Sequence, residues 1–161
     1  MKRKKICKAY NYEYLTANNF ILMLYSLCYI STKRIGLTSL DIIEIVEKSK
    51  NKNSNRKITG VLINYKNNFL QHLEGDPVLI YELFEQIKKD SRHEKVSLLG
   101  YSPINSRLFE KWEMTYKDLN ESIENQIDFD DLKHSLDELI DKKSFWKGIE
   151  TIEAMSNLIK I

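Results

Sequence analysis

Two apolar segments joined by a short polar turn constrain the fold of this chain more than any other feature of its sequence. Residues 58–65 and 69–73 are mostly apolar, and the turn between them, at 66–68, contains two Asn. This pattern predicts a β-hairpin. The sequence Gly-Asp-Pro at 75–77 follows directly and predicts the start of a helix, because Asp is a good helix cap and Pro suits the first helical position.

The regions on either side of the hairpin complete an alternation of strands and helices. Three more apolar runs predict strands: residues 20–30, 96–101 and 112–116. Thr38 and Ser39 can cap a helix at residues 41–48, whereas the polar, Asn-rich stretch 50–57 predicts a loop. The resulting order, β-α-β-β-α-β with a fifth strand, is the ferredoxin-like pattern and predicts an α+β fold. Such a sheet carries both helices on one face and leaves its other face open.

The charge of the chain is unevenly distributed and suggests three parts. The net charge is +2, yet residues 1–8 contain five basic and no acidic side chains. We expect residues 1–22 to be an N-terminal extension, with Met1 and Met23 both open as the natural start, and residues 23–116 to form one domain. Residues 117–161 contain six basic and eleven acidic side chains, and their apolar spacing predicts two helices. These helices would cap the open face or the edge of the sheet, or pack against a second subunit.

Several classes of function are disfavoured by what the sequence lacks. A net charge of +2 argues against a strongly basic nucleic-acid binder, and the chain has neither a Gly-rich phosphate loop nor a Gly-x-Ser-x-Gly motif. Its three His are scattered and show no metal-binding spacing. The two Cys suit a reducing cytoplasm. The apolar run at 20–30 is too short to span a membrane and lacks the cleavage site of a signal peptide.

Five short motifs follow one another along the chain at a spacing that is specific to one protein family. They are LYSLCYIS at 24–31, ITGVL at 58–62, FLQHLEG at 69–75, DSRH at 90–93 and RLFEKWEM at 107–114. Together they resemble the BLUF family of flavin-binding blue-light sensors over residues 23–116. The resemblance implies a flavin ring held between the two helices of a ferredoxin-like fold. It also implies FAD rather than FMN, a bacterial origin, and a photoreceptor that is not an enzyme.

The resemblance assigns the photochemistry to Tyr29 and Gln71. Blue-light absorption needs a chromophore, which a flavin supplies because no natural side chain absorbs blue light. By similarity, Tyr29 donates the electron, and Gln71 relays the proton and then changes its hydrogen bonds to the flavin. An amide suits this role because its acceptor oxygen and its donor nitrogen lie on opposite branches. Tyr25 lies on the same face of the strand, but only Tyr29 has the family spacing from Gln71.

The resemblance also implies a set of flavin-binding residues. They are Ile45, Ser49, Asn53, Phe69, Ile87, Arg92 and His93. Asn53 would bond the polar edge of the ring, and Arg92 with His93 would approach the phosphate side. Ordinary structural roles are the alternatives: turn chemistry for Asn53, an exposed basic turn for Arg92 and His93, and core packing for the apolar residues. Lys52 replaces an Asn that is frequent in the family, and Lys can donate a hydrogen bond but cannot accept one.

Output is expected to leave the domain near the end of the matched region. Trp112 and Met114 match the pair on the fifth strand that carries the signal in the family, and Met is flexible enough to change position. Residues 117–161 are too few for an average effector domain, so we expect a separate protein partner, with a homo-oligomer as a further expectation. Two alternatives stay open: an interaction module that has lost its photochemistry, and a small hydrolase or nucleic-acid binder.

Overall fold

The computed structural model describes residues 23–109, 114–120, 128–143, 150, 152 and 153. Its strands are β1 (Leu24–Lys33), β2 (Thr59–Tyr65), β3 (Asn68–Gly75), β4 (His93–Ile104) and β5 (Thr115–Asp118). Its helices are α1 (Ser39–Asn55), α2 (Pro77–Ile87) and α3 (Asp128–Lys142). The predicted extension at 1–22 lies outside the described residues.

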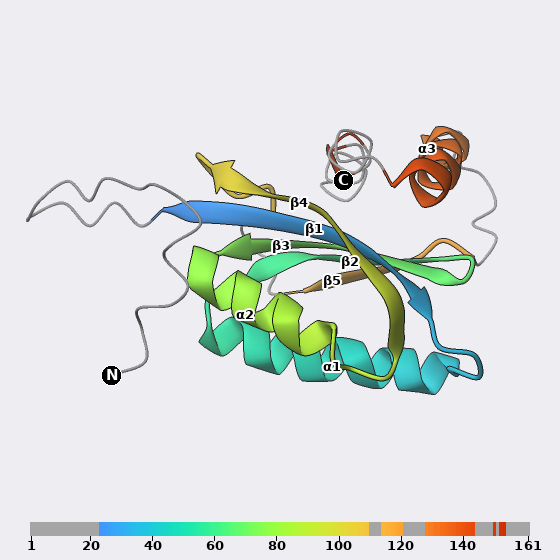
Figure 1. Ribbon diagram of the computed structural model, residues 1–161, viewed down its shortest axis with the longest axis horizontal. Helices are drawn as coiled ribbons and strands as arrows, with labels where there is room; N and C mark the ends of the chain where they lie inside the picture. The colour runs from blue at the N-terminus through green and yellow to red at the C-terminus, as the bar shows by residue number, and fades with distance from the viewer. Residues whose placement is uncertain (1–22, 110–113, 121–127, 144–149, 151, 154–161) are drawn as a thin grey trace, which may run out of the picture.

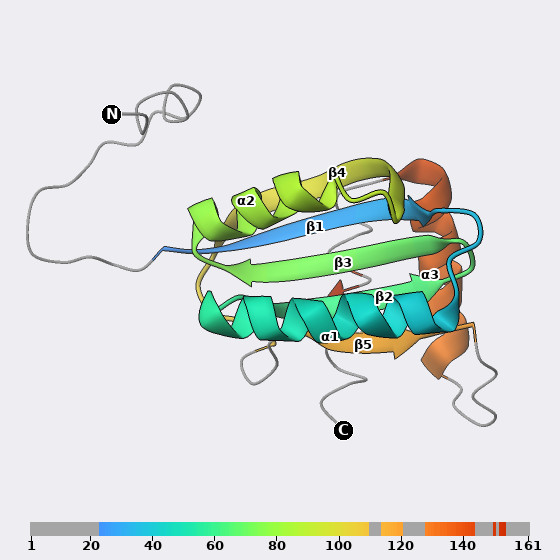
Figure 2. The same ribbon diagram turned by 90° about the horizontal axis from the view of Figure 1, so that it is seen from below.

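The strands form one five-stranded sheet in the order β4-β1-β3-β2-β5. β1 pairs antiparallel with β3 and β4, β2 pairs antiparallel with β3, and β5 adds parallel to β2. α1 and α2 lie side by side on one face, with α2 over β1 and α1 over β2 (Figure 1, Figure 2). This arrangement confirms the predicted α+β, ferredoxin-like fold with a fifth strand.

Alternation along the strands separates two apolar clusters, one on each face of the sheet. The cluster under α1 and α2 contains Tyr29, Leu62 and Phe69 together with apolar side chains of both helices. The cluster on the opposite face contains Cys28 and Ile63 and includes side chains of α3. A step of one residue along a central strand therefore moves a side chain from one cluster to the other.

α1 is longer than the sequence pattern indicates, and the predicted loop at 50–57 is wrong. The helix begins with a capping box, in which the Thr38 side chain accepts from the Asp41 N–H and the Asp41 carboxylate accepts from the Thr38 N–H. It continues to Asn55, because Asn53 is only 1% exposed and prolongs the buried side of the helix beyond its last apolar residue. Burial in the folded protein thus outweighs the weak helix propensity of Asn.

The last two strands differ from their predicted bounds. β4 extends beyond 96–101 at both ends and begins at His93. β5 begins at Thr115, later than the predicted 112–116, and Met114 lies directly before it. The position of β5 depends on its parallel pairing with β2, a contact between distant parts of the chain that no local pattern reveals.

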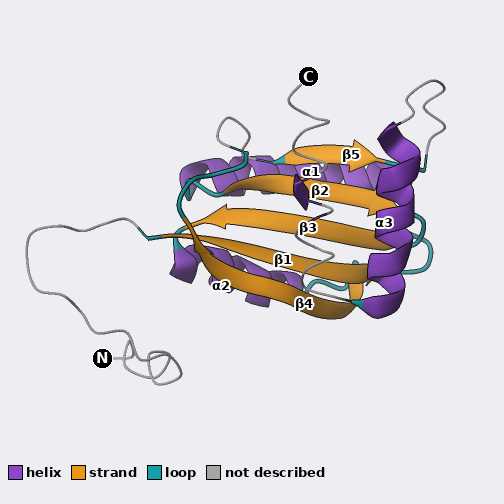
Figure 3. Cartoon of the chain, turned by 90° about the horizontal axis from the view of Figure 1, so that it is seen from above, coloured by secondary structure: helices purple, strands orange, loops and turns teal. Residues whose placement is uncertain are grey.

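α3 lies across one end of the sheet, on the face opposite α1 and α2 (Figure 3). Its Leu136 and Leu139 are buried in the apolar cluster of that face, and Lys66 in the β2–β3 turn pairs with Asp137 at 2.5 Å. The expected cap over the open face is confirmed for this helix, whereas most of the second predicted tail helix lies outside the described residues. Among the helices that the structure describes, none is both long and apolar enough to cross a membrane.

Candidate functional site

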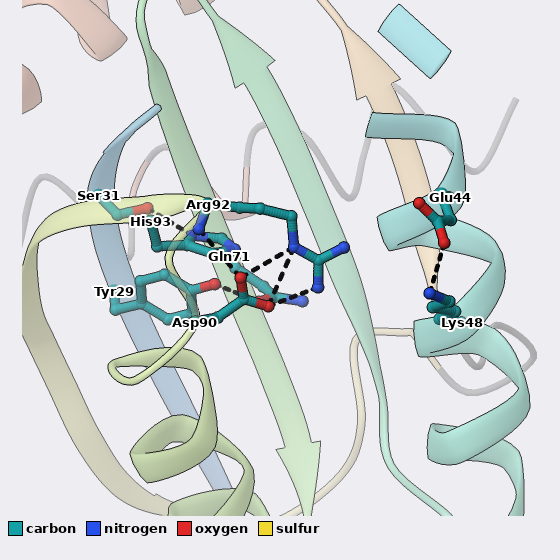
Figure 4. A network of polar contacts seen from close by, with 8 residues as sticks. All are labelled: Tyr29, Ser31, Glu44, Lys48, Gln71, Asp90, Arg92 and His93. Atoms are coloured by element: carbon teal, nitrogen blue, oxygen red, sulfur yellow. Dashed lines mark hydrogen bonds and ion pairs between the residues drawn. The ribbon is translucent and has the colours of Figure 1, made fainter. Parts of the chain in front are cut away.

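Tyr29 and Gln71 meet across the two central strands of the sheet. They are register partners on β1 and β3, and Tyr29 belongs to the cluster under α1 and α2. The Tyr29 hydroxyl donates to Gln71 Oε1 at 2.5 Å (Figure 4). Tyr29 is 0% exposed and Gln71 is 5% exposed. The strand register therefore brings the two predicted photoactive residues into direct contact, away from water.

The other end of the Gln71 amide contacts Met114. Gln71 Nε2 donates to Met114 Sδ at 3.3 Å, and Met114 is buried. The amide therefore uses its oxygen toward a phenol and its nitrogen toward a thioether. A rotation of the amide would change both contacts at once. Trp112, which we predicted as the companion of Met114, lies outside the described residues.

Burial further favours the neutral form of Tyr29, which is already the ordinary form of a phenol at neutral pH. Its ring lies 5.5 Å from the Phe84 ring of α2 and 6.2 Å from the His93 ring, measured between centroids. Loss of solvation raises the pKa of Tyr29 well above its ordinary value, and the nearby Asp90 acts in the same direction. The phenol is therefore protonated at neutral pH and keeps its hydrogen-bond donor.

His93 belongs to the same site as a buried, neutral ring. Its Nδ1 lies 2.9 Å from Ser31 Oγ, and its ring centroid lies 5.2 Å from that of Phe69. Burial lowers the pKa of His93 to about 4, although Asp90 raises it. Ser31 was not predicted as a site residue, but it lies two positions after Tyr29 on the same strand, and this spacing could have identified it.

Arg92 is held in place by a carboxylate two residues away. Its Nε donates to Asp90 Oδ1 at 2.8 Å and to Oδ2 at 3.1 Å, and its Nη2 also donates to Oδ2. These hydrogen bonds are the main cause that lowers the pKa of Asp90 to about 2. The turn between α2 and β4 therefore presents a guanidinium whose orientation Asp90 sets, a role for Asp90 that we had not predicted.

The remaining predicted site residues lie on the two helices that cover this face. Ile45 and Asn53 are buried on α1, and Ser49 between them is half-buried. Ile87, the last residue of α2, packs against the same apolar cluster as Ile45. Lys52 is exposed to solvent. The site thus has one group of residues around Tyr29 and Gln71 and a second group on α1.

The side chains of this face fit the chemistry of a flavin. A flavin has a flat aromatic ring with carbonyl and N–H groups along one edge, and an amide can serve both kinds of group. Gln71 and Asn53 provide two buried amides, while Phe69 and Ile45 provide apolar surface for a ring. Arg92 provides a cation of the kind that binds phosphates. Within the described ranges, no group of His, Cys, Asp and Glu is arranged to hold a metal ion.

Comparison with known proteins identifies the class to which this fold and site belong. Residues 24–115, more than half of the chain, match the family described as BLUF, sensors of blue-light using FAD. The chain therefore belongs to the BLUF family, whose domains are flavin-binding sensor modules.

Solved structures of light-regulated proteins share the fold. BlrB, described as a BLUF protein in its dark state, has a TM-score of 0.70 at 27% identity, covering 86% of this chain and 98% of that chain. A bacterial light-regulated adenylyl cyclase has a TM-score of 0.70 at 30% identity, covering 75% of this chain and 35% of that chain. Klebsiella pneumoniae BlrP1, described with FMN and cyclic diGMP, has a TM-score of 0.58 at 32% identity, covering 61% and 26%.

Curated relatives are much longer proteins. The beta subunit of photoactivated adenylate cyclase from Euglena gracilis is 30% identical over 91 residues, which is 56% of this chain and 11% of that protein. The alpha subunit from the same organism is 31% identical over 86 residues, which is 53% of this chain and 8% of that protein. This chain therefore spans about a tenth of their length. Since these relatives come from Euglena, the bacterial origin stays a prediction.

Proposed function

We propose that this chain is a blue-light photoreceptor that binds FAD noncovalently and signals through a protein partner, without turning over a substrate. The observation that carries the proposal is the buried series of hydrogen bonds from Tyr29 to Gln71 and from Gln71 to Met114. Bound FAD would supply the absorption of blue light and an excited state that accepts an electron. Within the chain, Tyr29 is the electron donor of the proposal.

The proposed light response is a proton movement along these hydrogen bonds. The Tyr29 hydroxyl lies 2.5 Å from Gln71 Oε1, so its proton can pass to Gln71 as the phenol loses an electron. When the electron and the proton return, Gln71 is left in a changed orientation or tautomer. Because the contact of Gln71 Nε2 with Met114 depends on that orientation, the change reaches the residue directly before β5. A signal follows if the two states of this contact favour different conformations.

We assign flavin binding to the predicted residues on this face of the sheet and on the two helices that cover it. Asn53 is proposed for the polar edge of the ring, with apolar and small side chains along the ring itself: Ile45, Ser49, Phe69 and Ile87. Arg92 and His93 are proposed for the phosphate side. Since the pKa of His93 is lowered to about 4, Arg92 would supply the charge and His93 a neutral hydrogen-bonding ring. The choice of FAD over FMN is supported by the family description.

We also propose the organisation of the chain and its output. Residues 23–116 form the sensor domain, residues 117–161 form a helical cap, and residues 1–22 form an extension. A protein partner in the cytoplasm would bind near Met114 and the acidic cap, with self-association as a second form of output. The net charge of −5 in residues 117–161 suits a basic partner surface and disfavours nucleic acid.

Replacing Tyr29 with Phe tests this function, because the change removes one hydroxyl and keeps the ring. The unmodified protein, supplied with FAD, should be yellow, and blue light should shift its flavin absorption band reversibly to longer wavelength. Tyr29→Phe should still bind the flavin but show no shift, since the electron and proton donor is gone. Absorption spectra recorded before and after illumination measure both properties.

Tyr25→Phe is the matched control for this experiment. Tyr25 lies on the same face of the same strand, is also buried, and packs against the Tyr101 ring at 4.9 Å. Its variant should keep the light-induced shift. A protein that stays colourless after flavin supplementation, or that binds flavin without any shift, would overturn the proposed function. A shift that survives in Tyr29→Phe would remove Tyr29 from its proposed role.

A further inference from the structure

A fully buried carboxylate lies at the end of β3, on the face of the sheet that α3 covers. Glu74 is 0% exposed and takes hydrogen bonds from four donors. His72 Nε2 lies 3.1 Å from Glu74 Oε1, and the Leu108 N–H donates to the same oxygen at 2.9 Å. Thr59 Oγ1 and the Phe109 N–H both donate to Oε2 at 3.2 Å. The carboxylate thus joins its own strand, β2 and the segment that follows β4.

Only an ionised carboxylate can serve this set of donors. Burial alone would raise the pKa of Glu74, but the hydrogen bond and charge of His72 and the N–H groups of Leu108 and Phe109 lower it below its ordinary value. Within the described part of the chain, His72 Nδ1 is buried and has no hydrogen-bond partner. A proton on that atom would be buried unpaired, whereas the Nε2–H has the Glu74 carboxylate as its acceptor.

Arg107 ties the same segment to the end of β3 and to the start of β2 through three further hydrogen bonds. Its Nη1 donates to the backbone oxygen of Glu74 at 2.6 Å and to Thr59 Oγ1 at 2.8 Å. Its Nη2 donates to the backbone oxygen of Lys57 at 2.7 Å. The planar guanidinium therefore spans the end of β3 and the residues that enter β2, which a single ammonium group could not do.

The segment held in this way leads to both faces of the molecule. Phe109 is buried in the same apolar cluster as Leu136 and Leu139 of α3. Five residues further along the chain, Met114 is buried on the other face, where it accepts the hydrogen bond from Gln71. The position of residues 107–109 therefore bears on the α3 side and on the predicted photoactive side.

We propose that Glu74, together with Arg107, is a positioning residue that holds residues 107–109 on the end of β3. By holding this segment it sets where Met114 meets Gln71, and it links the face of Tyr29 to the face of α3. The light-dependent part of this inference rests on the proposed function. The holding of residues 107–109 by Glu74 and Arg107 does not rest on the proposed function, and it can be tested in the dark without flavin.

Glu74→Gln tests the holding of the segment with a nearly isosteric change. In either orientation of the new amide, its NH2 group faces the N–H of Leu108 or that of Phe109, so one of these loses its acceptor. Thr59 can rotate its hydroxyl, and His72 can adapt only by moving its proton to the unpaired Nδ1, but a backbone N–H cannot adapt at all. Hydrogen exchange at that amide in the full chain should become roughly tenfold faster or more, because a bond to a charged acceptor is lost.

Two further variants make the result decisive. Glu44→Gln is the matched control, since Glu44 is an exposed carboxylate paired with Lys48 on α1, and exchange at 108 and 109 should not change. Arg107→Lys keeps the Glu74 carboxylate and the positive charge at position 107, but it loses the planar guanidinium that reaches several acceptors. If Glu74→Gln does not fold, this variant tests the proposal in its place. Faster exchange at 108 or 109 in folded Glu74→Gln, or in Arg107→Lys if Glu74→Gln does not fold, supports the proposal. Unchanged exchange in folded Glu74→Gln, or in Arg107→Lys if that variant must decide, overturns it.

The same variants test the link to Gln71 once the unmodified protein has shown its light-induced shift. Glu74→Gln retains Tyr29 and Gln71, so the shift should remain, while its recovery in the dark should change by roughly twofold to thirtyfold. Recovery at the unmodified rate, despite faster exchange at residues 108 and 109, would overturn the link. Absence of any shift in the unmodified protein would overturn the proposed function instead, and the exchange data would still decide whether Glu74 holds the segment.

Discussion

Single residues around Tyr29 show how burial controls charge at this site. Loss of solvation raises the pKa of the Tyr29 phenol and lowers the pKa of the His93 ring to about 4, so both are neutral at neutral pH. Asp90 stays ionised there, because its hydrogen bonds to Arg92 lower its pKa to about 2. The site therefore combines neutral hydrogen-bonding groups with a paired charge on Asp90 and Arg92.

The low pKa of His93 predicts that the protein loses stability in mild acid. In the unfolded chain a His has an ordinary pKa of about 6.5, whereas the folded value is about 4. Between these values the unfolded state binds a proton that the folded state does not bind. The free energy of unfolding should therefore fall as the pH drops through this range, by about 3 kcal/mol at most. Urea unfolding at a series of pH values measures the fall.

His93→Gln is the comparison protein for this pH dependence. Gln retains a donor and an acceptor but does not titrate, so its free energy of unfolding should vary less over the same range. Glu74, whose lowered pKa gives stability that is lost as the pH falls toward more acidic values, is common to both proteins. The difference between the two curves therefore isolates His93. Parallel curves would contradict a buried His93 that stays neutral in the folded protein.

At the scale of elements, the position of Gln71 depends on close packing of β2 against β3. Gly60 of β2 pairs with Leu73 of β3. A Cβ atom at position 60 would lie 2.0 Å from the backbone oxygen of His72, which cannot withdraw without breaking the ladder. The absence of a side chain at Gly60 therefore allows the strand register that carries Gln71 to its contact with Tyr29.

Gly60→Ala is predicted to destabilise the protein by roughly 1–3 kcal/mol or more, because the new methyl group collides with backbone rather than with a movable side chain. Gly36→Ala is the comparison: its φ of 87° is unfavourable for Ala, but nothing lies within 4 Å of the added atom. In Gly36→Ala the free energy of unfolding should fall only by the conformational cost of a positive φ, about 1–2 kcal/mol. Thermal unfolding of both variants measures the difference. A smaller loss of stability for Gly60→Ala than for Gly36→Ala would show that the paired backbones of β2 and β3 can move apart.

Elements with local signals could be predicted from the sequence, whereas those that depend on distant contacts could not. The β2–β3 hairpin and the start of α2 are encoded by the contiguous stretches 66–68 and 75–77. The last turns of α1 are polar in sequence, and their helical form becomes clear only when Asn53 is seen to be buried. β5 was misplaced by a few residues because its bounds follow from pairing with β2.

The residues of the candidate site also divide into those that the sequence could predict and those that it could not. Tyr29 and Gln71 were chosen from the family resemblance, and their contact then follows from the register of β1 and β3. The hydrogen bonds of Glu74 could not be predicted, because two of them come from the backbone N–H groups of Leu108 and Phe109. In an irregular segment, the pattern of side chains does not predict the direction of a backbone N–H.

At the scale of the whole molecule, one sheet separates the proposed photoactive residues from α3 (Figure 1). Tyr29 and Met114 lie in the cluster under α1 and α2, and Leu139 of α3 lies in the cluster on the opposite face. A change at Gln71 must therefore pass through or around the sheet to reach α3. Glu74 holds residues 107–109 at the end of β3, where Phe109 enters the cluster of the α3 side, and we expect the change to pass between the faces there.

This separation predicts that stability and the light response can be altered independently. Leu139→Ala should destabilise the protein by roughly 2–5 kcal/mol, because it leaves a cavity at a fully buried position, while Leu40→Ala on α1, where Leu40 is 77% exposed, should have little effect. At a temperature where Leu139→Ala remains folded, its light-induced shift should be unchanged. Tyr29→Phe should lose the shift at a cost of roughly 1–3 kcal/mol, because the buried Gln71 oxygen loses its donor. Denaturant unfolding and absorption spectroscopy on the three variants test this, and loss of the shift in folded Leu139→Ala would place the α3 face within the photoactive site.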